Sequence, residues 1–139
     1  MSYGTEPIED TELLFRRVRL DLYDATRDSK LSPHAFRPVE SDSQGLSIYR
    51  AKYISAENTA RNDRGKRYFI AVLRAGDLRA KGIEVVPRPS QEDPGHAELP
   101  GLRYENRREV HAEEWQEVLA NELCLRVEGP FPPLNSPVG

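Results

Sequence analysis

The segment "RYFIAVLRA", residues 67–75, constrains the fold most, because it is apolar on both of its alternating faces. In an extended strand, Phe69, Ala71 and Leu73 point to one side, and Ile70 and Val72 point to the other. A strand that is apolar on both sides is covered above and below by other elements. The pattern therefore predicts a sheet in which this segment is a central strand.

The other elements are shorter. Alternating or apolar segments predict strands over 15–22, 46–53, 83–89 and the end of 123–129. Ser32 before Pro33 is a typical N-cap of a single helical turn, and Ser55 is a typical N-cap of a short helix, "SAENTARND", that ends at Gly65. The clearest helix is 111–124, where Trp115 and the apolar residues after it recur at helical spacing. Interspersed strands and short helices predict an α+β fold with a mixed or mostly antiparallel sheet and one longer C-terminal helix.

The length of 139 residues fits one domain. We expect a loosely ordered N-terminus over 1–10, the domain over 11–129 and a proline-rich tail over 130–139. The net charge of −3 gives no global basic field, which argues against a nucleic-acid partner. A single cysteine, Cys124, excludes an intramolecular disulfide and a cysteine-cluster zinc site. Neither a signal peptide nor a membrane-spanning stretch is recognisable, so a cytoplasmic location is expected and no membrane partner.

The stretch "EDPGHAELPG", residues 92–101, holds the first candidate for catalysis. His96 lies between two proline–glycine turns, and Glu98 would share its face if the segment is extended. A histidine can act as a general acid or base, and the glutamate can orient it or bind a cation with it. The spacing also occurs in zinc deaminases, but the Pro-Cys-x-x-Cys motif is missing, which excludes that class. The alternative is that His96 only ties a stiff loop to nearby backbone.

Two other segments hold candidates for ligand binding. Arg16 and Arg17 on the first strand can clamp a phosphate, or can be an ordinary solvated or ion-paired pair. In "LSIYRAKY", alternation puts Ser47 and Tyr49 on one face, and Arg50 with the apolar residues on the other. These three residues could line a pocket or form a plain sheet face. Ser47 stands in no Gly-x-Ser-x-Gly nucleophile motif.

Other signals of chemistry are weak. The basic run "RNDRGKR", residues 61–67, has no interleaved aromatic residues and is interpreted as a solvated loop. Neither Gly-x-Gly-x-x-Gly nor the P-loop pattern occurs. His34, His96 and His111 are far apart in sequence. We therefore predict no metal site and no cofactor.

The order of several motifs resembles that of a group of small uncharacterised bacterial proteins. They share an arginine-rich opening strand ("ELLFRRV"), a Leu-Ser strand ("GLSIYRAKY") and a late Pro-x-His-Ala-x-hydrophobic segment ("DPGHAELPG"). The resemblance covers roughly residues 13–99 and implies no particular activity. A weaker likeness is to RES-type and other ADP-ribosyltransferase-like domains, which implies an NAD pocket with Arg16 or Arg17, Tyr49 and Glu98 at matching positions. The Gly-Arg-Trp/Phe element typical of RES domains does not occur here.

Two functions are therefore carried forward. The first is a binding or interaction module for a protein or small-molecule partner, within the cytoplasm of a bacterium. The alternative is an enzyme on a nucleotide-type ligand, such as an ADP-ribosyltransferase-like or RES-like NAD-using domain, with arginine clamping phosphate and His96 or Glu98 as the polar catalytic group. Convergence of the arginines, Tyr49 and His96 on one pocket would favour the enzyme. The partner and the oligomeric state are not indicated by the sequence.

Overall fold

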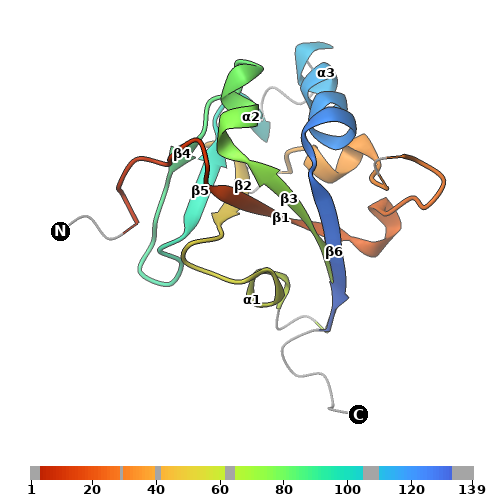
Figure 1. The fold of residues 1–139 in the computed structure, drawn as a ribbon, viewed down its shortest axis with the longest axis horizontal. Coiled ribbons are helices and arrows are strands. Elements are labelled where there is room, and N and C mark those ends of the chain that lie inside the picture. The colour runs from red at the N-terminus through yellow and green to blue at the C-terminus, as the bar shows by residue number, and fades with distance from the viewer. Residues whose placement is uncertain (1–3, 29, 40–41, 62–64, 105–109, 133–139) are drawn as a thin grey trace.

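The computed structural model describes residues 4–28, 30–39, 42–61, 65–104 and 110–132 (Figure 1). Within them the chain forms one sheet of six strands in the order β4-β5-β2-β1-β3-β6. Every neighbouring pair is antiparallel. The strands are β1 (Leu13–Arg19), β2 (Leu46–Arg50), β3 (Tyr68–Arg74), β4 (Val86–Pro87), β5 (His96–Leu99) and β6 (Arg126–Phe131). The predicted α+β class is confirmed, and the sheet is antiparallel.

Short helices cover both faces of this sheet. Figure 1 shows α1 on one side of the sheet, and α2 and α3 on the other. Ser55 caps α1 by accepting a hydrogen bond from the Asn58 backbone, and Ser32 caps the η2 turn at Pro33, as the sequence predicts. The helical elements are α1 (Ala56–Ala60), α2 (Ala75–Ala80), α3 (Val110–Val118), the 3₁₀ turns η1 (Leu20–Leu22) and η2 (Pro33–Phe36), and the π-helical turn η4 (Leu119–Leu123).

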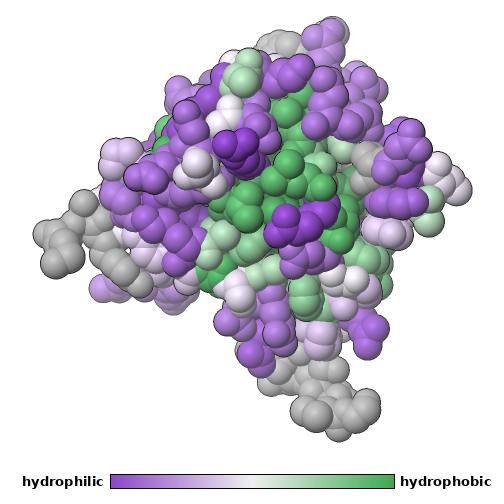
Figure 2. Space-filling model, in the orientation of Figure 1, coloured by the Kyte–Doolittle hydropathy of each residue, from purple (hydrophilic) through white to green (hydrophobic). Residues whose placement is uncertain are grey.

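The hydrophobic core is divided by the sheet. The larger cluster contains Leu14 and Leu73 from the strands and packs them against α2, η2 and η4. The smaller cluster contains Phe15 and Val72 and packs them against Ala60 of α1. Strand β3 thus contributes to both clusters and pairs with β1 and β6, which confirms it as an interior strand. Figure 2 shows hydrophobic side chains gathered in the middle of the visible face, over β3 and β6, with hydrophilic ones around them.

Several predicted boundaries were wrong. The first strand lies at Leu13–Arg19 and gives way to η1, where the prediction continued it to residue 22. The helix from Ser55 ends at Ala60, and residues 62–64 lie outside the described part of the chain. The stiff loop predicted around His96 is in fact strand β5, because β2 on one side and β4 on the other supply its ladder. Residues 133–139 of the predicted tail are also outside the described residues.

The described part of the N-terminal segment is held more firmly than the sequence suggests. Ile8 is only 3% exposed and belongs to the larger core cluster. The side chain of Arg50 donates hydrogen bonds to the carbonyl oxygens of Gly4 and Glu6, 3.2 and 3.0 Å away. The stretch from Gly4 onward is therefore part of the packed domain, although its composition predicts a loose end.

Candidate functional site

Strands β2 and β5 bring four of the predicted site residues onto one face of the sheet. In their antiparallel register, Ser47 lies opposite Glu98 and Tyr49 lies opposite His96. Since side chains alternate along each strand, all four point to the side on which α1 lies. The Tyr49 and His96 rings meet edge to face with their centres 5.5 Å apart. Sequence reasoning predicted the two halves of this group, and long-range strand pairing joins them.

His96 is fixed by hydrogen bonds at both ring nitrogens. Its Nδ1 lies 3.0 Å from the backbone oxygen of Arg88, and its Nε2 lies 3.2 Å from the hydroxyl oxygen of Ser47. A carbonyl oxygen can only accept, so Nδ1 must be the protonated nitrogen. In the neutral ring, Nε2 then accepts the hydroxyl hydrogen of Ser47. This is the geometry of a base beside a hydroxyl, and it also ties β5 to β2 and to Arg88, the residue after β4.

Asp42 is a third member of this network that sequence reasoning missed. It is only 2% exposed, and its carboxylate accepts a hydrogen bond from the Val39 backbone at 2.7 Å. Its other oxygen lies 3.3 Å from both the backbone nitrogen and the hydroxyl of Ser47. The available signal was an aspartate in the turn "ESDSQG", since aspartate often bonds backbone near a turn. The Ser47 hydroxyl has one hydrogen to share between Asp42 and His96.

Glu98 does not orient the imidazole. Its carboxylate pairs with the guanidinium of Arg88 at 3.0 Å, and the Glu98 side chain is only 11% exposed. The orienting acceptor for His96 is the Arg88 backbone instead. The Arg88 residue therefore serves both predicted catalytic residues, one through its side chain and one through its carbonyl group.

Arg17 extends the same sheet face toward α1. Its Nε donates to the backbone oxygen of Thr59 at 3.0 Å. Its guanidinium also stands 6.0 Å from the Tyr49 ring centre and 5.4 Å from that of Tyr68, within the range of cation–π attraction. Arg17 thus ties α1 to the sheet from a place beside Tyr49.

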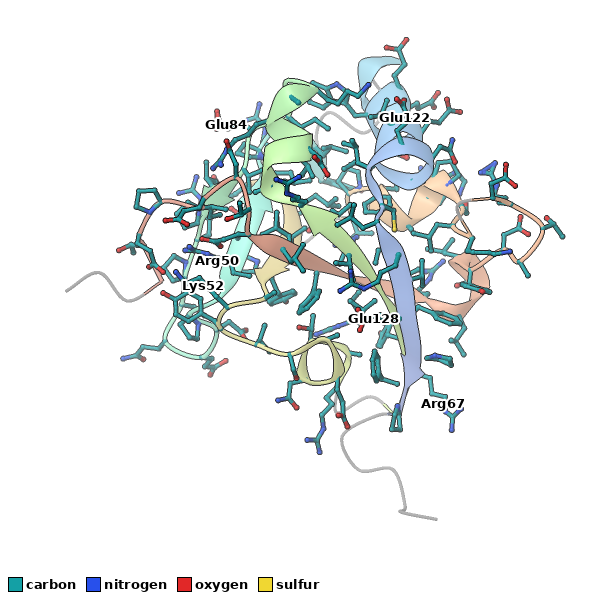
Figure 3. All side chains as sticks on the ribbon, in the orientation of Figure 1. Arg50, Lys52, Arg67, Glu84, Glu122 and Glu128 are labelled. Carbon is teal, nitrogen blue, oxygen red and sulfur yellow. The ribbon has the colours of Figure 1, made fainter. Side chains whose placement is uncertain are left out.

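Arg50 and Arg16 point to the opposite face. Arg50 is fully buried, and its guanidinium makes a two-pronged ion pair with Glu12 at 2.9 and 2.7 Å. Burial alone lowers the pKa of Arg50, but the hydrogen bonds and charge of Glu12 outweigh burial, and the net pKa is raised. Figure 3 shows Arg50 and Lys52 near the N-terminal segment. The Arg50 donors are thus directed to that segment rather than to an open pocket.

Arg16 lies where β1 and β2 separate. Their paired register ends at Phe15 opposite Tyr49. The guanidinium of Arg16 donates to the backbone oxygen of Ser47 at 2.9 Å and to that of Ala35 at 3.1 Å. It forms no ion pair with a carboxylate of the described residues. Burial lowers its pKa, and the charge of Asp42 offsets only part of that effect.

A pocket of about 340 Å³ adjoins Arg16. Its polar wall includes Arg19, His34 and Arg37. Arg19 pairs with Asp21, whereas the side chains of His34 and Arg37 make no hydrogen bond or ion pair within the described structure. The volume is within the usual range for small-molecule sites. We call it the arginine pocket, and it is lined by Arg16, Arg17, Arg19, Leu22, His34, Ala35, Arg37, Pro38, Val39 and Tyr104.

The arginine pocket and the His96 group are joined by one residue. Ser47 presents its backbone oxygen to Arg16 and its hydroxyl to His96. Among the predicted site residues, Arg16 and Arg17 line the arginine pocket, and Tyr49, His96 and Glu98 do not. Arg16 lines the arginine pocket on one side of β2, and Tyr49, His96 and Glu98 occupy the other side of the sheet.

Other chemistry is sparse among the described residues. They contain no group of three or more histidine, cysteine, aspartate or glutamate side chains placed to hold a metal ion. Burial raises the pKa of the Cys124 thiol, which points toward the Arg126 backbone oxygen at 3.3 Å. Such a thiol is a poor nucleophile at neutral pH. No helix in the described ranges has the length and apolar character needed to span a membrane.

Comparison of the chain with protein-family models, curated proteins and solved structures finds no match. The resemblances noted from the sequence therefore stay predictions.

Proposed function

We propose that this chain is a binding module for a small anionic ligand, which it holds in the arginine pocket. The observation that carries the proposal is Arg16, a partly buried guanidinium whose described partners are two backbone oxygens and no carboxylate. A buried cation is ordinarily paired, because removing it from water is costly. The charge of Asp42 offsets only part of this cost at Arg16, and an anion bound in the pocket would supply the rest.

The rest of the pocket supports the same ligand class. Among the described residues, the side chains of Arg37 and His34 have no hydrogen-bond or ion-pair partner, so they can turn toward an incoming anion. Guanidinium groups bind carboxylates and phosphates with paired hydrogen bonds. The apolar wall of Leu22, Pro38 and Val39 can cover the uncharged part of such a ligand. The shared chemistry is an oxyanion, either phosphate or carboxylate, on a small organic body.

Isothermal titration of the protein with phosphate, pyrophosphate, acetate and citrate tests the proposal and separates the two kinds of oxyanion. We expect saturable binding with a Kd of about 1 mM or tighter for at least one of them. Arg37→Gln should weaken that binding about ten-fold, because a charge-assisted hydrogen bond is lost. Arg126→Gln removes an exposed arginine that pairs with Glu128 outside the pocket, and it should leave the affinity unchanged. Equal affinity in the two variants, or no binding of any oxyanion, would overturn the proposal.

An enzyme on a nucleotide-type ligand is the second candidate, and the contact of Ser47 with His96 is what favours it. A serine beside a neutral imidazole can act as a nucleophile. However, the Asp42 carboxylate lies 3.3 Å from the same hydroxyl and opposes negative charge developing there. The binding module is therefore the better-supported function. Release of nicotinamide from NAD by the wild type and not by His96→Ala would reverse that order.

A further inference from the structure

A second pocket, of about 300 Å³, adjoins the arginine pocket. The two share His34 and Arg37, which form one wall of the second pocket together with Pro33 of η2. The opposite wall comes from α3, which packs against η2. That wall carries Glu113, Gln116 and Glu117, and we call the second pocket the dipolar pocket.

The dipolar pocket holds opposite charges that do not pair. Glu113 and Glu117 are four residues apart on α3 and are exposed on the same side of the helix. Within the described residues, neither carboxylate forms an ion pair or hydrogen bond, and neither do the side chains of His34 and Arg37. Two carboxylates four residues apart repel each other slightly, so this pair does not stabilise α3.

Gln116 lines the same wall, one residue before Glu117 on α3, and carries an unpaired polar atom. It is only 4% exposed, yet its amide nitrogen has no hydrogen-bond partner in the described structure. Buried amides are nearly always hydrogen-bonded. The unpaired nitrogen is a hydrogen-bond donor, which an ammonium group cannot satisfy. The last side-chain torsion of glutamine is broad, however, so the amide can turn, and its oxygen can then accept a hydrogen bond from an ammonium group. The α3 wall thus holds two exposed carboxylates and a buried amide whose nitrogen is unpaired among the described residues.

We propose that the ligand is zwitterionic: its oxyanion binds Arg16 and Arg37, and an ammonium group of the same molecule binds Glu113 and Glu117. This inference rests on the proposed function, because it assigns the second half of the same ligand. A purely anionic ligand long enough to enter the dipolar pocket would face two carboxylates. An ammonium group there has two counter-charges and an amide oxygen within one wall.

Matched ligands measure the ammonium contribution directly. The probes are ω-aminoalkyl phosphates from aminoethyl to aminohexyl, each paired with the alkyl phosphate that lacks the amine. A parallel series of ω-amino acids and the corresponding fatty acids covers a carboxylate as the anion. We expect one chain length to bind about ten-fold more tightly than its amine-free partner. The length series is needed because the ammonium must span from the arginines to α3.

Variants of the dipolar pocket test whether its carboxylates cause the ten-fold gain in affinity from the amine. The double variant Glu113→Gln, Glu117→Gln should abolish the ten-fold gain and leave the amine-free phosphate unaffected, since both side chains are exposed and outside the arginine pocket. Glu122→Gln is the matched control, because Glu122 pairs with Lys81 and lines neither pocket. Gln116→Leu should reduce the gain with no loss of amine-free binding.

The outcomes separate this inference from the proposed function. If alkyl phosphates or fatty acids bind and no amine improves them, the zwitterion is refuted and the anion-binding module stands. If the gain persists in the double variant, the ammonium lies elsewhere and the inference is again refuted. If neither series binds at all, the proposed function itself fails.

Discussion

Replacement of Arg50 by methionine should be among the most destabilising single changes in this domain. Arg50 has no exposed side-chain surface, and its partner Glu12 is only 10% exposed. The substitution fills a similar space with an apolar chain but leaves the Glu12 carboxylate buried without a counter-charge. It also removes the donors to the carbonyl oxygens of Gly4 and Glu6.

The expected loss follows from that geometry. Breaking a buried ion pair by removing one partner costs about 3–5 kcal/mol. At roughly 4 °C per kcal/mol for a domain of this size, the melting temperature should fall by about 12–20 °C. Adding Glu12→Leu to Arg50→Met should recover part of this loss, because the unpaired charge is then gone. The recovery should be incomplete, since the two carbonyl oxygens of the N-terminal segment still lack their donor.

Urea unfolding followed by tryptophan fluorescence measures these changes. Trp115 is the only tryptophan and packs against the main core, so its emission reports loss of the fold. Arg126→Met is the control, because its ion pair with Glu128 is exposed and worth less than about 1 kcal/mol. If Arg50→Met were no more destabilising than this control, the buried pair would not anchor the N-terminal segment and the reasoning would be refuted.

Three further predictions concern single sites. The Tyr53 hydroxyl, and then Lys52, lower the pKa of Glu6 from 4.5 to about 2, so its stabilising contribution is complete above pH 4.5 and is lost as the pH falls toward 2. Acid titration of the unfolding midpoint should therefore be flatter for Glu6→Gln than for the wild type across that interval, and identical curves would contradict the pairing. In Gly101→Ala, the new Cβ would stand 2.3 Å from the Trp115 ring, so we expect a loss of about 1–3 kcal/mol and a shifted fluorescence maximum; an unchanged spectrum would show that the ring does not press on the glycine. His96→Ala should cost about 1–2 kcal/mol in urea unfolding, because two hydrogen bonds are lost. A double-mutant cycle with Ser47→Ala should give a coupling of about 0.5 kcal/mol or more, and strict additivity would argue against the contact.

Local signals in the sequence predicted the local structure. The caps at Ser32 and Ser55 act within three residues, and the two-sided apolar pattern around Val72 depends only on alternation. These features depend on short-range geometry, so the amino-acid sequence alone is enough to predict them. Helix ends were less well predicted, because the last turns of α1 and α3 depend on what packs against them.

Features that need distant partners were not predictable. Prolines and glycines around His96 indicate a loop, and only pairing with β2, about fifty residues earlier in the chain, makes that segment a strand. Arg50 was placed correctly beside Leu46 and Ile48 by alternation, but its partner Glu12 is 38 residues away. The arginine pocket joins residues 16–39 with Tyr104, and no sequence pattern links segments so far apart.

The edges of the sheet have a consequence for how this domain behaves at high concentration. The outer strands are β4, which is two residues long and ends in Pro87, and β6, which contains Pro130. A proline has no backbone N–H and interrupts the row of donors that a foreign strand needs for pairing. Arg126 and Glu128 also place charges along β6. Both edges therefore resist strand addition, and the folded domain should remain free of edge-to-edge aggregation even when it is crowded or fused to other β-rich domains.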